Sequence, residues 1–133
     1  MIVGLGVDLV EIERVRRLID ARGDRAMTRL FTDGERAYAG YRVDPARHFA
    51  ARIAAKEAAF KALAGNDLAR GIGWRELEVF PRPDGGPVLR LHGRAERRAT
   101  ELGVTRVLVS ISHTDTMAVA VVVLERTAGS EPS

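Results

Sequence analysis

The sequence has 133 residues, a formal net charge of +3 and no cysteine. This length suits one domain with its own hydrophobic core, and the absence of cysteine excludes disulfides, thiolate metal sites and a cysteine nucleophile. No apolar run approaches the roughly 20 residues of a membrane helix, and the first residues lack the basic segment and the cleavage site of a signal peptide. We therefore expect a cytoplasmic protein that does not enter a membrane. The positive charge favours an acidic partner.

Residues 2–9 predict a β-strand with two unlike faces, because their side chains alternate in character. One face carries apolar bulk and the other is almost bare. The first comprises Val3, Leu5, Val7 and Leu9, and the second comprises Ile2, Gly4, Gly6 and Asp8. Glycine inside a strand often marks the close approach of another backbone or a ligand.

Helices follow this strand. The spacing of apolar residues predicts a helix over 11–21, then a turn and a second short helix, and a further helix that begins at Thr32. The longest helix is predicted from Pro45 to Leu63, with Gly65 as its C-cap. It is rich in alanine and therefore thin, so another chain or a ligand could come close to its axis.

The second half predicts strands and one exposed helix. A strand that includes Leu77 and Val79 leads into a turn and a second strand, and the helix that follows is closed by Gly103. Two further strands, 106–112 and 117–125, form an antiparallel hairpin. The predicted class is α+β, an antiparallel sheet packed on one long helix. Residues 1–126 are expected to form the single domain, and 127–133 a disordered tail.

The long helix carries charges within its apolar run. Glu57 and Lys61 are four residues apart and share a face, whereas Arg52 and Lys56 lie on a different stripe. Taken alone, the first pair is best explained as an ordinary ion pair on a solvated helix, worth about 0.3–0.5 kcal/mol. Asp8 taken alone is best explained as a capping-box residue three positions before Glu11, although a cap and a metal ligand are compatible roles.

The combination of these residues favours chemistry. Asp8 follows a glycine-lined strand face, and Glu57 lies on a thin helix with Lys61 one turn further on. Mg²⁺ is commonly held by one or two carboxylates, with waters and substrate phosphates as its other ligands. A lysine nearby would offset the negative charge of those phosphates. The sequence therefore predicts metal-assisted phosphoryl transfer, although it contains no P-loop motif.

Three segments resemble the signature blocks of the holo-acyl-carrier-protein synthases, the small bacterial-type members of the 4'-phosphopantetheinyl transferases. They are GLGVDLVEIERV, ARIAAKEAAFKAL and VSISHTDTMAVAVVV, and the resemblance extends to about Glu125. It implies transfer of 4'-phosphopantetheine from coenzyme A to a serine of acyl carrier protein, with release of adenosine 3',5'-bisphosphate. It also implies the transferase fold, Mg²⁺, a homotrimer with active sites between protomers, and a place in fatty acid or polyketide biosynthesis.

The resemblance assigns roles to particular residues. The family's metal ligands correspond to Asp8 and Glu57, and its active-site lysine corresponds to Lys61. Either carboxylate could be the general base for the serine, and the sequence does not decide between them. Arg14 matches the family's arginine that docks the carrier protein, although a solvated basic helix face is the alternative. Ile53 stands where the family usually has a bulky aromatic residue, which affects the shape of the pocket.

Further residues lie in segments that resemble the family's nucleotide-binding regions. They are Arg52, Lys56, Gly85, Gly86, Pro87 and His113. Each has a plain alternative: a surface cation, an ordinary hairpin loop, or a histidine that organises its own turn with Asp115. We therefore expect them to contact coenzyme A, but on weaker grounds than the metal ligands.

Two other classes of protein fit the sequence less well than an enzyme. A non-catalytic trimeric binding protein on the same scaffold would lack one of the two carboxylates or the lysine, and all three are present. A nucleic-acid-binding module would need interleaved aromatic residues or a recognition motif, whereas the chain has one Trp, two Tyr and four Phe. The sequence favours the enzyme over both.

Overall fold

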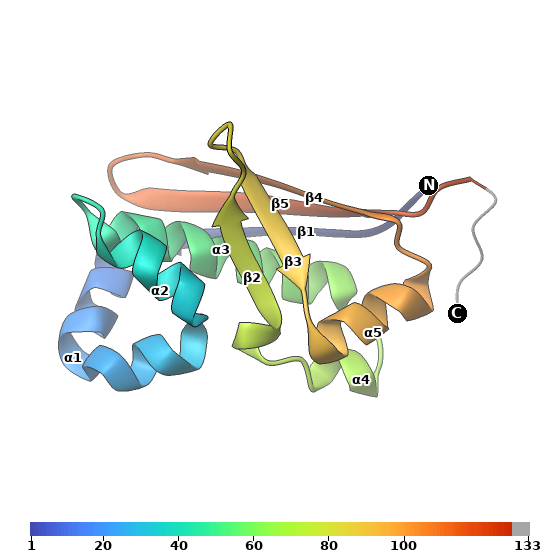
Figure 1. The fold of residues 1–133 in the computed structure, drawn as a ribbon, viewed down its shortest axis with the longest axis horizontal. Helices are drawn as coiled ribbons and strands as arrows, with labels where there is room; N and C mark the ends of the chain where they lie inside the picture. The colour runs from blue at the N-terminus through green and yellow to red at the C-terminus, as the bar shows by residue number, and fades with distance from the viewer. Residues whose placement is uncertain (129–133) are drawn as a thin grey trace.

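The computed structural model describes residues 1–128, and it contains two antiparallel sheets, the larger of which has helices on one face only (Figure 1). The elements in chain order are β1 (Ile2–Glu11), α1 (Ile12–Leu30), α2 (Asp33–Gly40), α3 (Pro45–Leu63), α4 (Asp67–Arg70), η1 (Trp74–Glu76), β2 (Leu77–Pro81), β3 (Pro87–Leu91), α5 (Gly93–Leu102), β4 (Arg106–His113) and β5 (Met117–Glu125). Most of the tail that was expected to be disordered, residues 129–133, lies outside the described residues. Among the helices of residues 1–128, none combines the length and the apolar character that a membrane crossing needs.

The strands form two sheets rather than the single sheet expected. The larger sheet has the order β1-β5-β4, and the smaller one is the β2–β3 hairpin. The hairpin lies against α2, α3 and β4, and its Leu77 and Val79 are buried. Hairpin partners are adjacent in sequence, so their pairing is local, whereas membership of a common sheet depends on packing that no local pattern encodes.

The glycine face of β1 lies directly against α3. A Cβ atom built on Gly6 would lie 1.8 Å from the carbonyl oxygen of Ala58, and one on Gly4 would lie 2.4 Å from that of Ala62. Any side chain at either position would therefore collide with the helix backbone. The predicted close approach is correct, and the backbone that approaches the strand is that of the chain's own helix α3.

Helix α3 is buried on most of its circumference. It contacts the larger sheet on one side and α1, α2 and β2 on others (Figure 1). Its alanines form the centre of the core, and Ala54, Ala55 and Ala58 have no exposed surface. A helix that is apolar all round is a buried helix, which explains why its few charged side chains must find partners.

The opposite face of the larger sheet is uncovered in the single chain. Leu5, Val7 and Leu9 are 64%, 54% and 60% exposed, and Leu108 and Val121 on the neighbouring strands are exposed as well. These five residues are called the open sheet face below. A contiguous apolar surface of this kind marks an interaction site more often than a solvated one.

Local signals placed several helix ends correctly. Gly23 has φ 55° within α1 and separates its two helical segments, as the predicted turn requires. Thr32 caps α2 through a capping box with Glu35, and Gly103 ends α5 with φ 73°. Both devices satisfy backbone groups that a helix end leaves without partners.

Candidate functional site

Asp8, Glu57 and Lys61 meet where β1 lies on α3. Lys61 Nζ donates hydrogen bonds to Asp8 Oδ1 and to the Val7 carbonyl oxygen, each at 3.0 Å, although Lys61 and Asp8 are 53 positions apart. The glycine face of β1 permits this meeting, because Gly6 has no side chain and lets the strand approach the backbone of Ala58, the residue after Glu57. The predicted pair of Glu57 and Lys61 is therefore not an isolated pair on a solvated helix, since Lys61 forms its ion pair with Asp8.

The interpretation of Asp8 as a helix cap is wrong. Strand β1 continues to Glu11, which is the N-cap of α1 and makes no side-chain capping bond. The Asp8 side chain is only 13% exposed, and its Oδ2 atom is buried without a hydrogen-bond partner among the described residues. A buried carboxylate oxygen without a partner is unusual and calls for a cation or an ordered water.

Glu57 titrates abnormally beside Asp8. Partial burial, followed by the neighbouring Asp8 carboxyl, raises the pKa of Glu57 to about 7, while Lys61 and Arg14 act in the opposite direction. Two carboxylates that face each other repel in their ionised forms, and a divalent cation between them would relieve that repulsion. Residues 1–128 contain no cluster of three or more possible metal-ligating side chains. Two carboxylates suit Mg²⁺, which keeps several positions for water and phosphate.

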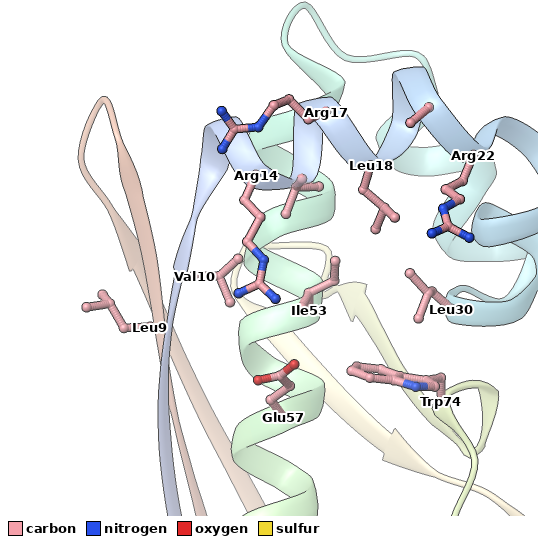
Figure 2. Close-up of a pocket in the computed structure, with 12 residues that line it drawn as sticks. Leu9, Val10, Arg14, Arg17, Leu18, Arg22, Leu30, Ile53, Glu57 and Trp74 are labelled. Carbon is pink, nitrogen blue, oxygen red and sulfur yellow. The ribbon is translucent and has the colours of Figure 1, made fainter.

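A groove opens beside Glu57, between α1, α3 and the end of β1 (Figure 2). Its volume is about 460 Å³. The lining is mostly apolar with three arginines from α1, and it comprises Leu9, Val10, Arg14, Val15, Arg17, Leu18, Ala21, Arg22, Leu30, Ile53, Glu57 and Trp74. In Figure 2 the guanidinium group of Arg14 points toward Glu57, and Trp74 lies across the groove from β1. The groove therefore joins a basic, partly apolar surface to Glu57, one member of the carboxylate pair.

Arg52 is a buried cation rather than a surface one. It is 5% exposed, its guanidinium group lies 4.8 Å from the centre of the Tyr38 ring, and it donates to the His48 carbonyl oxygen at 3.1 Å. Its Nε atom has no partner among the described residues. Burial lowers the pKa of Arg52 from its ordinary value. An anion would satisfy this side chain, so the expectation that it contacts a phosphate is physically reasonable.

Lys56 does not fit the prediction that it contacts coenzyme A. Its side chain has no exposed surface, and its ammonium group forms an ion pair with Glu35 at 2.6 Å. The same group donates to the carbonyl oxygens of Leu30 and Trp74, so all three of its hydrogen-bond donors are used inside the protein. The sequence did not reveal Glu35 as a partner, because its only local signal was the capping box at the start of α2.

The remaining predicted contacts lie away from the groove in the single chain. Gly85 and Gly86 belong to the turn between β2 and β3, Pro87 begins β3, and His113 ends β4. None of these four residues lines the groove. The turn that follows His113 is held by the Thr114 hydroxyl, which accepts hydrogen bonds from two backbone amides. His113 is exposed, and the hydrogen bonds of Thr114 hold the turn without it.

Comparison with known proteins identifies the family. A family model described as the 4'-phosphopantetheinyl transferase superfamily matches residues 4–122. The holo-[acyl-carrier-protein] synthase of Alkalilimnicola ehrlichii is 52% identical over 126 residues, which cover 94% of this chain and 98% of that one. The corresponding protein of Solibacter usitatus is 44% identical over 125 residues, covering 94% and 99%.

Solved structures agree with these sequences. The holo-[acyl-carrier-protein] synthase of Neisseria meningitidis superposes with a TM-score of 0.83 at 28% identity, covering 95% of this chain and all of that one. The enzyme of Bacillus anthracis, solved in complex with CoA (3',5'-ADP), gives a TM-score of 0.76 at 32% identity, covering 96% and 99%. The chain therefore belongs to the 4'-phosphopantetheinyl transferase superfamily, and within it to the holo-[acyl-carrier-protein] synthases.

Proposed function

We propose that this enzyme transfers 4'-phosphopantetheine from coenzyme A to a serine hydroxyl of apo acyl carrier protein, with Mg²⁺ held by Asp8 and Glu57. The family supports the reaction, and the complex of the Bacillus anthracis relative supports coenzyme A as the donor. One observation carries the metal site: within residues 1–128 the buried Asp8 Oδ2 atom has no hydrogen-bond partner, and it lies beside a second carboxylate, Glu57, whose pKa is raised. The product then serves fatty acid or polyketide biosynthesis.

Each charged side chain of the site has a separate role in the proposed reaction. Asp8 and Glu57 would hold Mg²⁺, which would supply charge neutralisation at the diphosphate of coenzyme A. The serine oxygen forms a bond to the phosphorus next to pantetheine, and the bond from that phosphorus to the oxygen of adenosine 3',5'-bisphosphate breaks. Lys61, whose side chain is 56% exposed and whose ammonium group pairs with Asp8, offsets negative charge on the phosphate oxygens. The serine proton passes to a carboxylate of the Asp8–Glu57 pair.

The carrier protein approaches over α1. Arg14, Arg17 and Arg22 line the groove together with apolar side chains, which suits an acidic partner that also presents apolar residues. Arg14 stands between this surface and Glu57, so a serine that enters the groove beside Arg14 arrives at the carboxylate pair (Figure 2). Charge of this kind accelerates encounter more than it tightens the final complex.

A homotrimer would complete the site. Strand β1 presents Asp8 to its own α3 and presents Val7 and Leu9 to the open sheet face, so an interface built on that face lies one residue from the metal ligand. A neighbouring copy could then supply His113, the turn that contains Gly85 and Gly86, and Pro87 at the start of β3, none of which lines the groove of the single chain. These residues and Arg52 are the proposed contacts of coenzyme A, and Lys56 is omitted because it is buried.

Incubation with coenzyme A, Mg²⁺ and apo carrier protein tests the reaction directly. Mass spectrometry should show the carrier protein gaining one phosphopantetheine group, and the Asp8→Asn variant should show almost no gain in the same time. A wild-type enzyme that binds coenzyme A without changing the mass of the carrier protein would instead indicate a non-catalytic binding protein.

A further inference from the structure

The ammonium group of Lys56 is held by three oxygen atoms from separate parts of the chain. It donates to Glu35 Oε1 at 2.6 Å, to the Leu30 carbonyl oxygen at 2.7 Å and to the Trp74 carbonyl oxygen at 3.0 Å. The ring of Phe31 lies 5.2 Å from the same nitrogen. The lysine has no exposed surface and no donor left over, so it cannot meet a substrate.

Two of these oxygen atoms belong to residues that line the groove. Leu30 is the last residue of α1 and Trp74 is the first residue of η1, and both side chains lie on the groove wall (Figure 2). The carboxylate of Glu35 extends the connection, because Oε1 also accepts from the Thr32 amide at 2.9 Å and Oε2 accepts from the Val79 amide at 2.8 Å. One buried ion pair thus joins α3 to four other segments.

Stability alone does not account for this pair. Removing two charges from water is costly, and apolar replacements of similar volume are often as stable as a buried ion pair. The ion pair adds structural specificity, because its hydrogen bonds fix where the Leu30 and Trp74 carbonyl groups lie relative to α3. Lys56 immediately precedes Glu57 on α3. The same rigid helix therefore fixes the positions of both the groove wall and the proposed metal ligand.

We propose that Lys56, through its ion pair with Glu35, is a positioning residue for the acceptor substrate. It holds Leu30 and Trp74 at a fixed distance from Glu57, so that the docked carrier protein presents its serine to the Asp8–Glu57 pair. This role rests on the proposed function, in which the groove receives the carrier protein. It predicts that loss of the ion pair weakens use of the carrier protein and leaves use of coenzyme A unaffected.

The test is the double variant Lys56→Met/Glu35→Gln, which removes both charges together and keeps one acceptor oxygen, for either the Thr32 or the Val79 amide. Arg98→Met is the matched control, because Arg98 is also a long, mostly buried cation that donates to two backbone carbonyl groups, those of Leu63 and Ala64. Arg98 does not line the groove. Steady-state kinetics is measured with each substrate varied, and the emission of Trp74, the single tryptophan, reports on the groove wall.

The double variant should raise the Michaelis constant for the carrier protein about tenfold, the size of effect that follows loss of a central aromatic contact in an interface. Its Michaelis constant for coenzyme A should stay within about twofold of wild type, and its Trp74 emission should shift. Arg98→Met should lower the melting temperature without either change. A double variant that folds with wild-type emission and a wild-type Michaelis constant for the carrier protein overturns the inference.

Two further outcomes separate the inference from the function. If the double variant does not fold, Lys56→Gln replaces it: a severalfold rise in the Michaelis constant for the carrier protein supports the role, and a wild-type value overturns it. If the wild-type enzyme transfers no phosphopantetheine, the proposed function fails, and the emission of Trp74 in the variants still decides whether Lys56 positions the wall.

Discussion

Substitution of Gly6 by alanine tests the contact that brings the two carboxylates together. The new Cβ atom would lie 1.8 Å from the Ala58 carbonyl oxygen, whereas ordinary contact begins at 3.4 Å, so β1 and α3 must separate by about 1.6 Å. Neither atom can rotate away, because one is fixed to the strand and the other belongs to the helix backbone. Overpacking of a core costs 1–3 kcal/mol, and we expect a loss of about 3 kcal/mol, at the upper end of that range.

The expected loss corresponds to a fall of roughly 10 °C in melting temperature for a chain of this size. Asp8 lies two residues after Gly6, and Glu57 immediately precedes Ala58, so the same separation should move the carboxylates apart and reduce phosphopantetheine transfer. Gly40→Ala is the control, because no atom lies within 4 Å of its Cβ position. Thermal unfolding and the transfer assay measure both effects. A Gly6→Ala variant that melts like Gly40→Ala and retains wild-type turnover would refute this reasoning.

Three further predictions concern the metal, the partner and the assembly. Without metal, the raised pKa of Glu57 contributes stability that is present below pH 4.5 and is lost as the pH rises through about 7. Added Mg²⁺ should therefore raise the melting temperature more at pH 8 than at pH 5.5. An equal rise at the two pH values would contradict the metal site. Arg14→Ala should raise the Michaelis constant for the carrier protein by about three- to tenfold at low salt and by less at high salt, because exposed charges are screened beyond about 8–10 Å; a salt-independent effect would exclude docking by charge. Val7→Lys places a charge on the open sheet face and should give a monomer by light scattering with little transfer activity, whereas a fully active monomer would show that no neighbour completes the site.

Much of the local structure was predictable because its causes are local. The capping box at Thr32, the turn at Gly23 and the C-cap at Gly103 each depend on residues within one turn of chain. The glycine face of β1 and the alanine-rich α3 also indicated that something must approach closely. The sequence could not say that each was the partner of the other, because that depends on how the chain folds back on itself.

The two lysines of α3 illustrate what sequence patterns leave undecided. Lys56 and Lys61 lie on the same helix in similar apolar surroundings, and both were predicted to face coenzyme A. Lys61 reaches Asp8 at the exposed edge of the core, whereas Lys56 points to Glu35 in the interior. Which face of a nearly all-round apolar helix is buried depends on the segments packed around it, and the low amphipathicity of α3 gave no guide.

The most direct test of the metal site is the binding of Mn²⁺, a paramagnetic substitute for Mg²⁺, followed by electron paramagnetic resonance in the presence of coenzyme A. If Asp8 and Glu57 share one cation, the wild-type enzyme binds one Mn²⁺ ion per chain with high affinity, and Asp8→Asn and Glu57→Gln each lose that ion while remaining folded. Retention of the ion with wild-type affinity in either folded variant would contradict a shared site.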